Sequence, residues 1–375
     1  MMAGGALAVS ALALMPPRST PSVEGRNRLD SDFEELLEAI AEAMDEYDVP
    51  GVGAGFAFSG AAPVIGLGVA EKSTGVPADA DTGFAIASIS KTYAAFAAMR
   101  LVEQGRLDLD TPIRQYLPTL RLGSQTATVT VTMRHLLTHT SGIQRDAPDD
   151  WTHFGDDPDA RARMIDRFGE LEQLFTPGRR YEYSNLGLDL AGRTIEVVAG
   201  QPYEMVIGEL ILQPLGLDRT SYVASDAADW KLATGYGGRR GRRAWPAFQV
   251  QRAEYADGGL VSTARDQLRY AQFWLGNGTA PSGTQLLTTA SMRQMTTPGR
   301  RAEDGWIGLG WFGETIDDVH VISHDGSVDG FASSITIVPA YGFALVLLTN
   351  SDSGGSLTTD VSTWALEYFL DLERE

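Results

Sequence analysis

The sequence predicts an α+β fold in which strands from both ends of the chain build one antiparallel sheet. Two strand patterns follow Pro50, GVGAGFAFSG at 51–60 and APVIGLGVAE at 62–71. Strands return near the C-terminus, where YGFALVLLTN at 341–350 is the near-continuous apolar run of a central strand buried on both faces. The intervening pattern, from about 105 to 250, is mostly helical. We therefore expect a sheet flanked by helices, an inserted mostly helical subdomain, and a site in the cleft between them.

Helical patterns begin and end the folded part. Residues 31–46 place Phe33, Leu36, Ile40 and Met44 on one stripe, with acidic residues in the first turn. The strand patterns near the C-terminus are WIGLGWFGE, VHVISH and FASSITIVP, ahead of the apolar run, and the amphipathic STWALEYFLDL follows them. The GRRGRR stretch at 238–243 is expected to be a solvated glycine-rich loop.

The N-terminal stretch is expected to lie outside the folded domain. Residues 2–15 form an apolar run too short to span a bilayer, similar to the core of a secretory signal but with no preceding Lys or Arg. We expect a signal-like leader and linker at 1–27 and one domain at 28–375, with its helical part at about 105–250. The remaining α/β part covers about 28–104 and 251–375. The leader favours export to the periplasm or the medium, and a cytoplasmic location stays open as the alternative.

Composition excludes several classes of function. A formal net charge of −19 argues against nucleic acid or an anionic membrane as the partner. The absence of cysteine excludes disulfides, thiol catalysis and thiolate metal sites. Only three of the 30 basic residues are lysines, Lys72, Lys91 and Lys231. Arginine cannot serve as a proton-accepting base. A lysine in a chain that otherwise uses arginine is therefore less readily explained as an ordinary surface charge.

The stretch FAIASISK at 84–91 places Ser88 three residues before Lys91, ahead of a helical pattern. At a helix start this spacing puts both side chains on one face, one turn apart. A neutral amine within reach of a serine hydroxyl can take its proton, an alternative to the Ser-His-Asp arrangement. The structural alternative is a simple helix-capping serine.

Two further motifs follow in order. Tyr183 and Asn185 alternate around Ser184, so in an extended segment both point the same way, and Asn185 could donate to a substrate carbonyl. The HDG at 324–326 is expected just ahead of a strand, where His324 supplies a donor. The Ser327 amide could share an oxyanion hole with the Ser88 amide. Taken singly, each motif is more often an ordinary turn or loop.

The ordered triple S-x-x-K, Y-x-N and H-x-G resembles the serine β-lactamase and penicillin-binding-protein superfamily, in its class C-like branch. That branch also holds DD-peptidases, D-aminopeptidases and family VIII carboxylesterases. The stretches HLLTHTSGI at 135–143, FTPGRRYEYSN at 175–185 and ADGGLVSTARDQL at 256–268 agree with it, and the resemblance covers roughly 30–372.

The resemblance implies a β-lactamase/transpeptidase-like fold and a role for each motif residue. It implies that Ser88 is the acylated nucleophile and that Lys91 is its proton partner. Tyr183 is the implied general base and acid, and Asn185 the implied contact to the substrate amide. His324 and Gly326 match the third motif, and the amides of Ser88 and Ser327 are the implied donors to the oxyanion.

The third motif departs from the pattern of β-lactam-hydrolysing members, which usually carry Lys-Thr-Gly or Lys-Ser-Gly. Here His324 and Asp325 replace the fixed positive charge and the hydroxyl that bind the substrate carboxylate. Histidine is mostly neutral near pH 7, and an aspartate facing the site repels a carboxylate. The departure favours an ester, or an amide without that anion.

The expected function is a serine hydrolase that forms an acyl-enzyme with a small-molecule or short-peptide ester or amide. Two alternatives stay open, a true β-lactamase or DD-peptidase and a slowly deacylating or inactive sensor. We expect no cofactor and no metal, because His135 and His139 lack the glutamate of an H-E-x-x-H site. No serine lies in a G-x-S-x-G, which excludes the nucleophile elbow of α/β-hydrolases.

Overall fold

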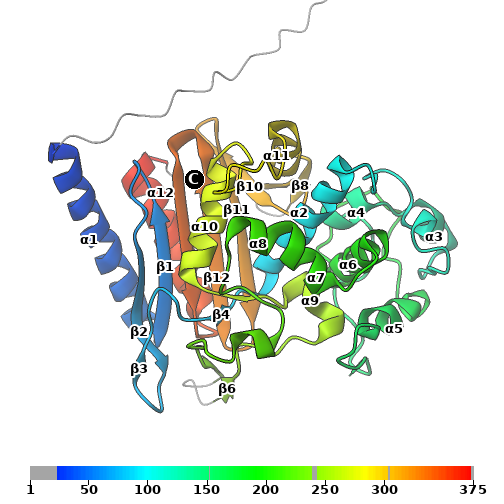
Figure 1. The fold of residues 1–375 in the computed structure, drawn as a ribbon, viewed down its shortest axis with the longest axis horizontal. Coiled ribbons are helices and arrows are strands. Elements are labelled where there is room, and N and C mark those ends of the chain that lie inside the picture. The colour runs from blue at the N-terminus through cyan, green and yellow to red at the C-terminus, as the bar shows by residue number, and fades with distance from the viewer. Residues whose placement is uncertain (1–22, 152, 239–242, 303–304, 373–375) are drawn as a thin grey trace, which may run out of the picture.

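The computed structural model describes residues 23–151, 153–238, 243–302 and 305–372 (Figure 1). Its strands are β1 Gly51–Ala57, β2 Val64–Glu71, β3 Val76–Pro77, β4 Phe84–Ala85, β5 Gly235–Gly237, β6 Arg243–Trp245, β7 Val261–Ser262, β8 Arg300–Ala302, β9 Gly305–Ile307, β10 Phe312–Ile316, β11 Val319–Val328, β12 Phe331–Val338 and β13 Phe343–Thr349. Its α-helices are α1 Val23–Glu46, α2 Ser90–Glu103, α3 Gln125–Thr130, α4 Met133–Leu137, α5 Ala160–Asp166, α6 Asn185–Ala199, α7 Tyr203–Ile207, α8 Gln213–Leu215, α9 Tyr255–Gly258, α10 Ala264–Leu275, α11 Thr289–Thr296 and α12 Gly354–Leu370.

One antiparallel sheet holds nine of the described strands in the order β3-β2-β1-β13-β12-β11-β10-β9-β8. The first long strand pairs with the last one, with Val52 opposite Thr349 and Ala57 opposite Ala344. Every residue of β13 is buried, which fits its apolar sequence and its place near the middle of the sheet. The prediction of one antiparallel sheet built from both chain ends is confirmed.

Helices cover both faces of the sheet, α1 and α12 on one side and α10 on the other (Figure 1). The residues of strand β1 show how helices pack against both faces of the sheet. Val52 and Phe56 belong to the core under α1 and α12, whereas Gly53 and Gly55 face α10 on the other side. A Cβ at Gly55 would lie 2.9 Å from the Cβ of Leu268 on α10, so only glycine permits this close approach.

The other helices lie mainly to one end of the sheet, where α2 packs against α6 and α9 (Figure 1). Helices α3 to α8 fall within 105–250, the stretch expected to be helical, together with the short β5 and β6. The division of the chain into an α/β part and a helical part remains a prediction. Most of the leader and of the GRRGRR loop lies outside the described residues.

Some boundaries differ from the sequence expectations. Helix α1 begins at Val23, inside the expected linker and eight residues before the predicted start. The pattern WIGLGWFGE is split between β9 and β10. Strand β11 does not end with VHVISH at His324 but continues to Val328, so the HDG motif lies within it. The strand continues because β11 pairs with β12 through Val328. No helix among the described residues is long and apolar enough to cross a membrane.

Candidate active site

Ser88 lies in a single 3₁₀ turn, Ala87–Ile89, between β4 and α2. The sequence pattern predicts Ser88 at the opening of the helix, but α2 begins at Ser90. Ala87 adopts φ +43°, a left-handed conformation that is uncommon for a residue with a Cβ and that turns the chain sharply before the serine. The Ser90 hydroxyl accepts a hydrogen bond from the Leu260 amide at 3.1 Å, which ties the turn to the segment leading into β7.

Lys91 is the buried amine of the site, with 1% of its surface exposed. Its Nζ donates to the Ser88 Oγ at 2.9 Å and to the main-chain oxygen of Asp257 at 2.5 Å. The Nζ also lies 5.1 Å from the centre of the Tyr183 ring. The spacing of the first motif therefore produces a direct contact between hydroxyl and amine, and the second motif lies next to it.

Tyr183 is held in place from behind by aromatic stacking. Its ring lies 4.3 Å from the His139 ring, at 28° between the planes, and 6.2 Å from the Phe312 ring. Burial and the nearby Lys91 lower the pKa of His139 well below its ordinary value, so the imidazole is neutral. Its Nδ1 then accepts a hydrogen bond from the Ser184 amide at 3.1 Å. His139 thus positions the segment that carries Tyr183.

Asn185 is the first residue of α6, and Ser184 caps that helix by accepting from the Gly187 amide at 2.9 Å. The Asn185 Nδ2 donates to a carboxylate oxygen of Asp146 at 2.6 Å. Its Oδ1 is buried and has no hydrogen-bond partner among the described residues. One N–H of the Asn185 amide is used by Asp146, and the second remains for the expected donation to a substrate carbonyl. The unpartnered Oδ1 adds an acceptor suited to a substrate N–H.

The third motif lies on β11, where Gly326 allows the strand to approach the nucleophile turn. A Cβ at Gly326 would lie 2.3 Å from the carbonyl oxygen of Ile86, which precedes the turn. The Ser333 hydroxyl donates to that same oxygen at 2.9 Å. These contacts fasten β11 and β12 beside Ser88, and Ser327 follows directly on β11. Glycine is therefore required at this position by a close approach to protein backbone.

His324 is buried and neutral. Burial and the Lys91 charge lower its pKa to about 3. Its Nδ1 lies 2.7 Å from the Asp325 carbonyl oxygen, and its Nε2 has no partner among the described residues. Asp325 and Ser327 are exposed on the opposite face of the strand from His324. The motif thus supplies no fixed positive charge.

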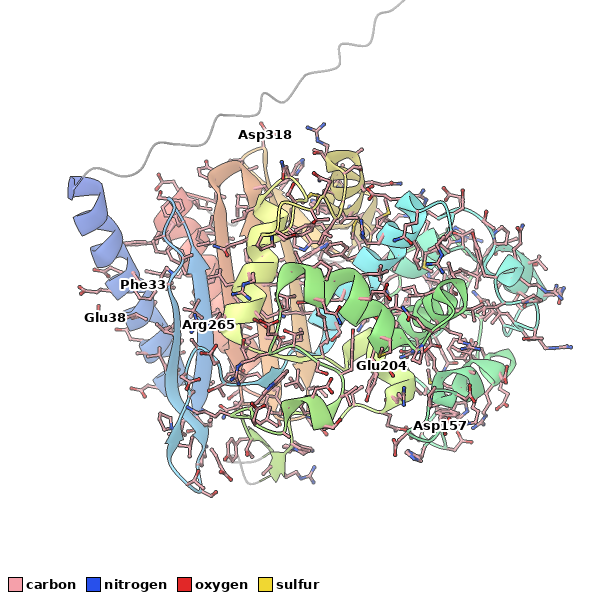
Figure 2. All side chains as sticks on the ribbon, viewed as in Figure 1. Phe33, Glu38, Asp157, Glu204, Arg265 and Asp318 are labelled. Carbon is pink, nitrogen blue, oxygen red and sulfur yellow. The ribbon has the colours of Figure 1, made fainter. Side chains whose placement is uncertain are left out.

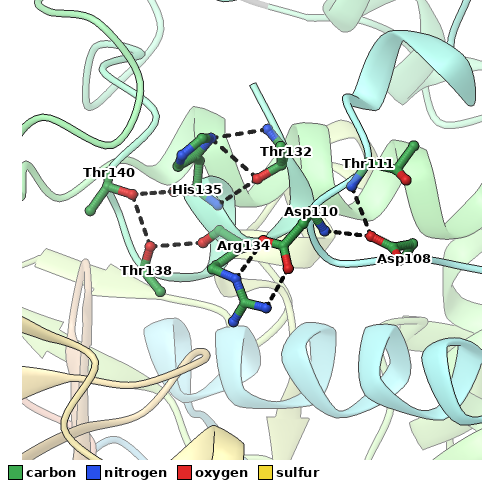
Figure 3. A network of polar contacts seen from close by, with 8 residues as sticks. All are labelled: Asp108, Asp110, Thr111, Thr132, Arg134, His135, Thr138 and Thr140. Carbon is green, nitrogen blue, oxygen red and sulfur yellow. Dashed lines mark hydrogen bonds and ion pairs between the residues drawn. The ribbon is translucent and has the colours of Figure 1, made fainter. Parts of the chain in front are cut away.

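The two histidines of HLLTHTSGI lie in different surroundings. His135 forms a capping box with Thr132 at the start of α4, and the Thr138 and Thr140 hydroxyls bond to each other beside it (Figure 3). Arg134 pairs with Asp110 through two short contacts in the same network (Figure 3). His139 instead stacks on Tyr183. No group of three potential ligands for a metal ion occurs within the described ranges.

A pocket of about 370 Å³ opens beside the nucleophile. It is lined by Ser88, Lys91, Asn185 and Ser327, which brings together the three motifs; Tyr183 and His324 do not line it. Acidic side chains that sequence reasoning missed form much of the remaining wall. They are Asp146, Asp149, Asp189, Glu254 and Asp257.

Glu254 in this wall is expected to destabilise the fold when ionised. Burial and the charges of Asp257 and Asp146 raise its pKa from 4.5 to about 7. A carboxyl whose folded-state pKa is raised contributes stability below about pH 4.5, which is lost as the pH rises through 7. We expect Glu254→Gln to raise the free energy of unfolding by about 1–3 kcal/mol at pH 8 and to change it little at pH 4. Urea unfolding at both pH values checks this, and equal stabilities at pH 8 would contradict it.

Comparisons with known proteins give a family and a shared fold. A family model described as Beta-lactamase matches residues 36–367. Penicillin-binding protein 4 of Amycolatopsis lactamdurans is 32% identical over 338 residues, covering 88% of this chain and 87% of that protein. The octameric penicillin-binding protein homologue from Pyrococcus abyssi superposes with a TM-score of 0.79 at 26% identity, over 91% of this chain and 78% of its own. A class C beta-lactamase from Rhodobacter sphaeroides shares the fold, with a TM-score of 0.74 at 24% identity, over 88% of this chain and 99% of its own.

Proposed function

Because this chain belongs to the beta-lactamase family of serine hydrolases, we propose that it hydrolyses an ester or amide through a covalent acyl-enzyme on Ser88. The observation that carries the proposal is the 2.9 Å contact between the Ser88 Oγ and the Lys91 Nζ at the edge of a pocket. A buried amine bonded to an accessible hydroxyl is the arrangement that proton transfer from a nucleophile requires.

In the proposed reaction the Ser88 Oγ attacks the substrate carbonyl carbon while Lys91 accepts the hydroxyl proton. The carbonyl oxygen becomes negative and is held by the main-chain N–H groups of Ser88 and Ser327. Tyr183, next to Lys91, gives a proton to the leaving group as the bond to it breaks. Water then attacks the acyl carbon of the acyl-enzyme and gives its proton to Tyr183. The bond between the acyl carbon and the Ser88 Oγ breaks, Lys91 returns the proton to Ser88, and the acid leaves.

The third motif supports a substrate without a carboxylate next to the scissile bond. His324 carries no positive charge at neutral pH, since its pKa is about 3. Asp325 is exposed on the strand face that it shares with Ser327, so its charge lies on the side open to solvent. A β-lactam or a peptide ending in a free carboxylate would find no matching cation at these positions. An ester or an amide without that anion meets no such penalty.

A paired assay tests the proposal. Wild type and Ser88→Ala are given p-nitrophenyl butyrate and a chromogenic cephalosporin under the same conditions. We expect serine-dependent turnover of the ester and little of the cephalosporin. Fast serine-dependent cephalosporin turnover would overturn the argument from His324 and Asp325. A burst of one equivalent that then stops would replace the hydrolase with a sensor, and no reaction with either compound would reject an ester substrate of this kind.

A further inference from the structure

The pocket beside Ser88 is strongly acidic. Of the side chains that line it within the described part of the chain, five are carboxylic and one, Lys91, is basic. Lys91 contacts none of the five carboxyl groups directly in the described residues, because its hydrogen bonds go to the Ser88 hydroxyl and to the main chain at Asp257. Its charge offsets only part of the effect that burial has on the pKa of Asp189 and Asp257. An unliganded pocket of this kind has an electrostatic preference for positive charge.

Asp189 gives this preference a specific location. It lies on α6 four residues after Asn185, on the same face of the helix, and its side chain is fully buried. Both of its carboxyl oxygens lack a hydrogen-bond partner among the described residues. Burial and the neighbouring Asp257 raise the pKa of Asp189 well above its usual range. A buried carboxyl without a partner is costly, and a bound cation would supply the partner that the protein does not.

Glu254 and Asp257 are half-buried, and neither carboxyl forms a hydrogen bond or an ion pair among the described residues. The charge of the nearby Lys91 acts on Asp257 without direct contact to its carboxyl group. Structural buried carboxylates elsewhere in this fold do have partners. Glu196 on the same helix as Asp189 is paired with both Arg161 and Arg193. Among the five carboxylic residues of the pocket, Asp146 alone has an arginine partner in the described part of the chain, Arg145 at 3.4 Å. Asp189, Glu254 and Asp257 form no such pair, and Arg161 acts on Asp189 and Asp257 through its charge and not through contact.

The proposed reaction identifies which part of the substrate enters the pocket. Tyr183, the proton donor to the leaving group, does not line it, whereas Asn185 and the oxyanion residue Ser327 do. The pocket is therefore on the acyl side of Ser88. We propose that it binds a positively charged group, an ammonium or a guanidinium, carried by the acyl part of the substrate. The choice of the acyl side rests on the proposed function, whereas the preference for a cation rests on the pocket alone.

Binding to Ser88→Ala tests the pocket without any chemistry. The two ligands are 4-(trimethylammonio)butyramide and 5,5-dimethylhexanamide, which have the same shape and differ in one positive charge. At pH 8 we expect calorimetry to show at least about tenfold tighter binding of the cation. Adding Glu254→Gln or Asp189→Asn should reduce that ratio severalfold. Equal affinity for the two ligands, or no binding of the cation at millimolar concentration, would overturn the proposal.

The matched control is Asp318→Asn, which removes the same charge at the exposed turn between β10 and β11 (Figure 2). It should leave the binding ratio unchanged in the Ser88→Ala background. A ratio that falls equally in Asp318→Asn would show that net charge alone produces the preference, and would reject a site in the pocket.

Turnover of the matching p-nitrophenyl esters by wild type separates this inference from the proposed function. We expect kcat/KM for the trimethylammonio ester to exceed that for its neutral counterpart by at least about tenfold. The ratio cancels any general loss of activity in a variant. Serine-dependent turnover of both esters at equal rates would reject the cation site and keep the hydrolase. Preferred binding of the cation without turnover of either ester would reject the hydrolase and keep the cation site.

Discussion

Ser88→Ala should lower kcat/KM for the ester by at least about 10⁴-fold and abolish covalent labelling by a fluorophosphonate. The Ser88 hydroxyl is the group that attacks the substrate in the proposed reaction. It lies 2.9 Å from the amine that would accept its proton. Its removal costs the fold little, because Lys91 keeps its bond to the Asp257 main chain. Circular dichroism and the unfolding midpoint should therefore stay close to wild type while labelling disappears.

Ser90→Ala is the matched control for that variant. It lies two residues further on, and its buried hydroxyl accepts from the Leu260 amide. We expect it to lose about 1–2 kcal/mol of stability and to keep its labelling by the fluorophosphonate. The two variants therefore have opposite expected results. Ser88→Ala loses labelling and keeps its stability, whereas Ser90→Ala keeps labelling and loses stability. Labelling of Ser88→Ala at the wild-type rate would mean that Ser88 is not the nucleophile.

Features that depend on local sequence could be predicted. The contact between Ser88 and Lys91 follows from a three-residue spacing near a helix start, and it survives although the turn is 3₁₀ rather than α-helical. The buried position of β13 follows from its unbroken apolar run. One local signal was missed. Ser184 is a favourable N-cap residue directly before a helical pattern, and this could have placed the start of α6 at Asn185.

Features that depend on distant contacts could not be predicted. The stacking of His139 on Tyr183 joins residues from two loops, and a sequence pattern gives no distance between them. The acidic pocket is assembled from the loop after α4, from α6, from the turn leading into α9 and from α9 itself, so its carboxyls come together only in the fold. Each of them, in the sequence, resembles an ordinary surface charge in an acidic protein. Only their burial and lack of partners distinguish Asp189 and Glu254 from the rest.

Lys91→Ala and Lys91→Arg should both lower kcat/KM for the ester by about 10²–10⁴-fold, the usual range for loss of a proton-transfer group. Arginine keeps the positive charge but cannot give up its proton, so a role in proton transfer predicts a loss in both variants. A purely electrostatic role predicts that arginine retains most of the activity. Lys72→Ala, which removes an exposed lysine over the Tyr236 ring, is the control and should behave as wild type.

Rescue by a small amine decides between a chemical and a structural role for Lys91. Arginine is larger than lysine, and a 1% exposed position gives it little space, so a loss in Lys91→Arg alone could reflect displacement of the Ser88 turn. Lys91→Ala leaves a space next to the Ser88 hydroxyl, at a pocket with room for methylamine. If Lys91 transfers protons, added methylamine should restore part of the lost kcat, more at higher pH where the amine is neutral. An absence of rescue, together with a lowered unfolding midpoint, would instead assign Lys91 to holding the turn through Asp257.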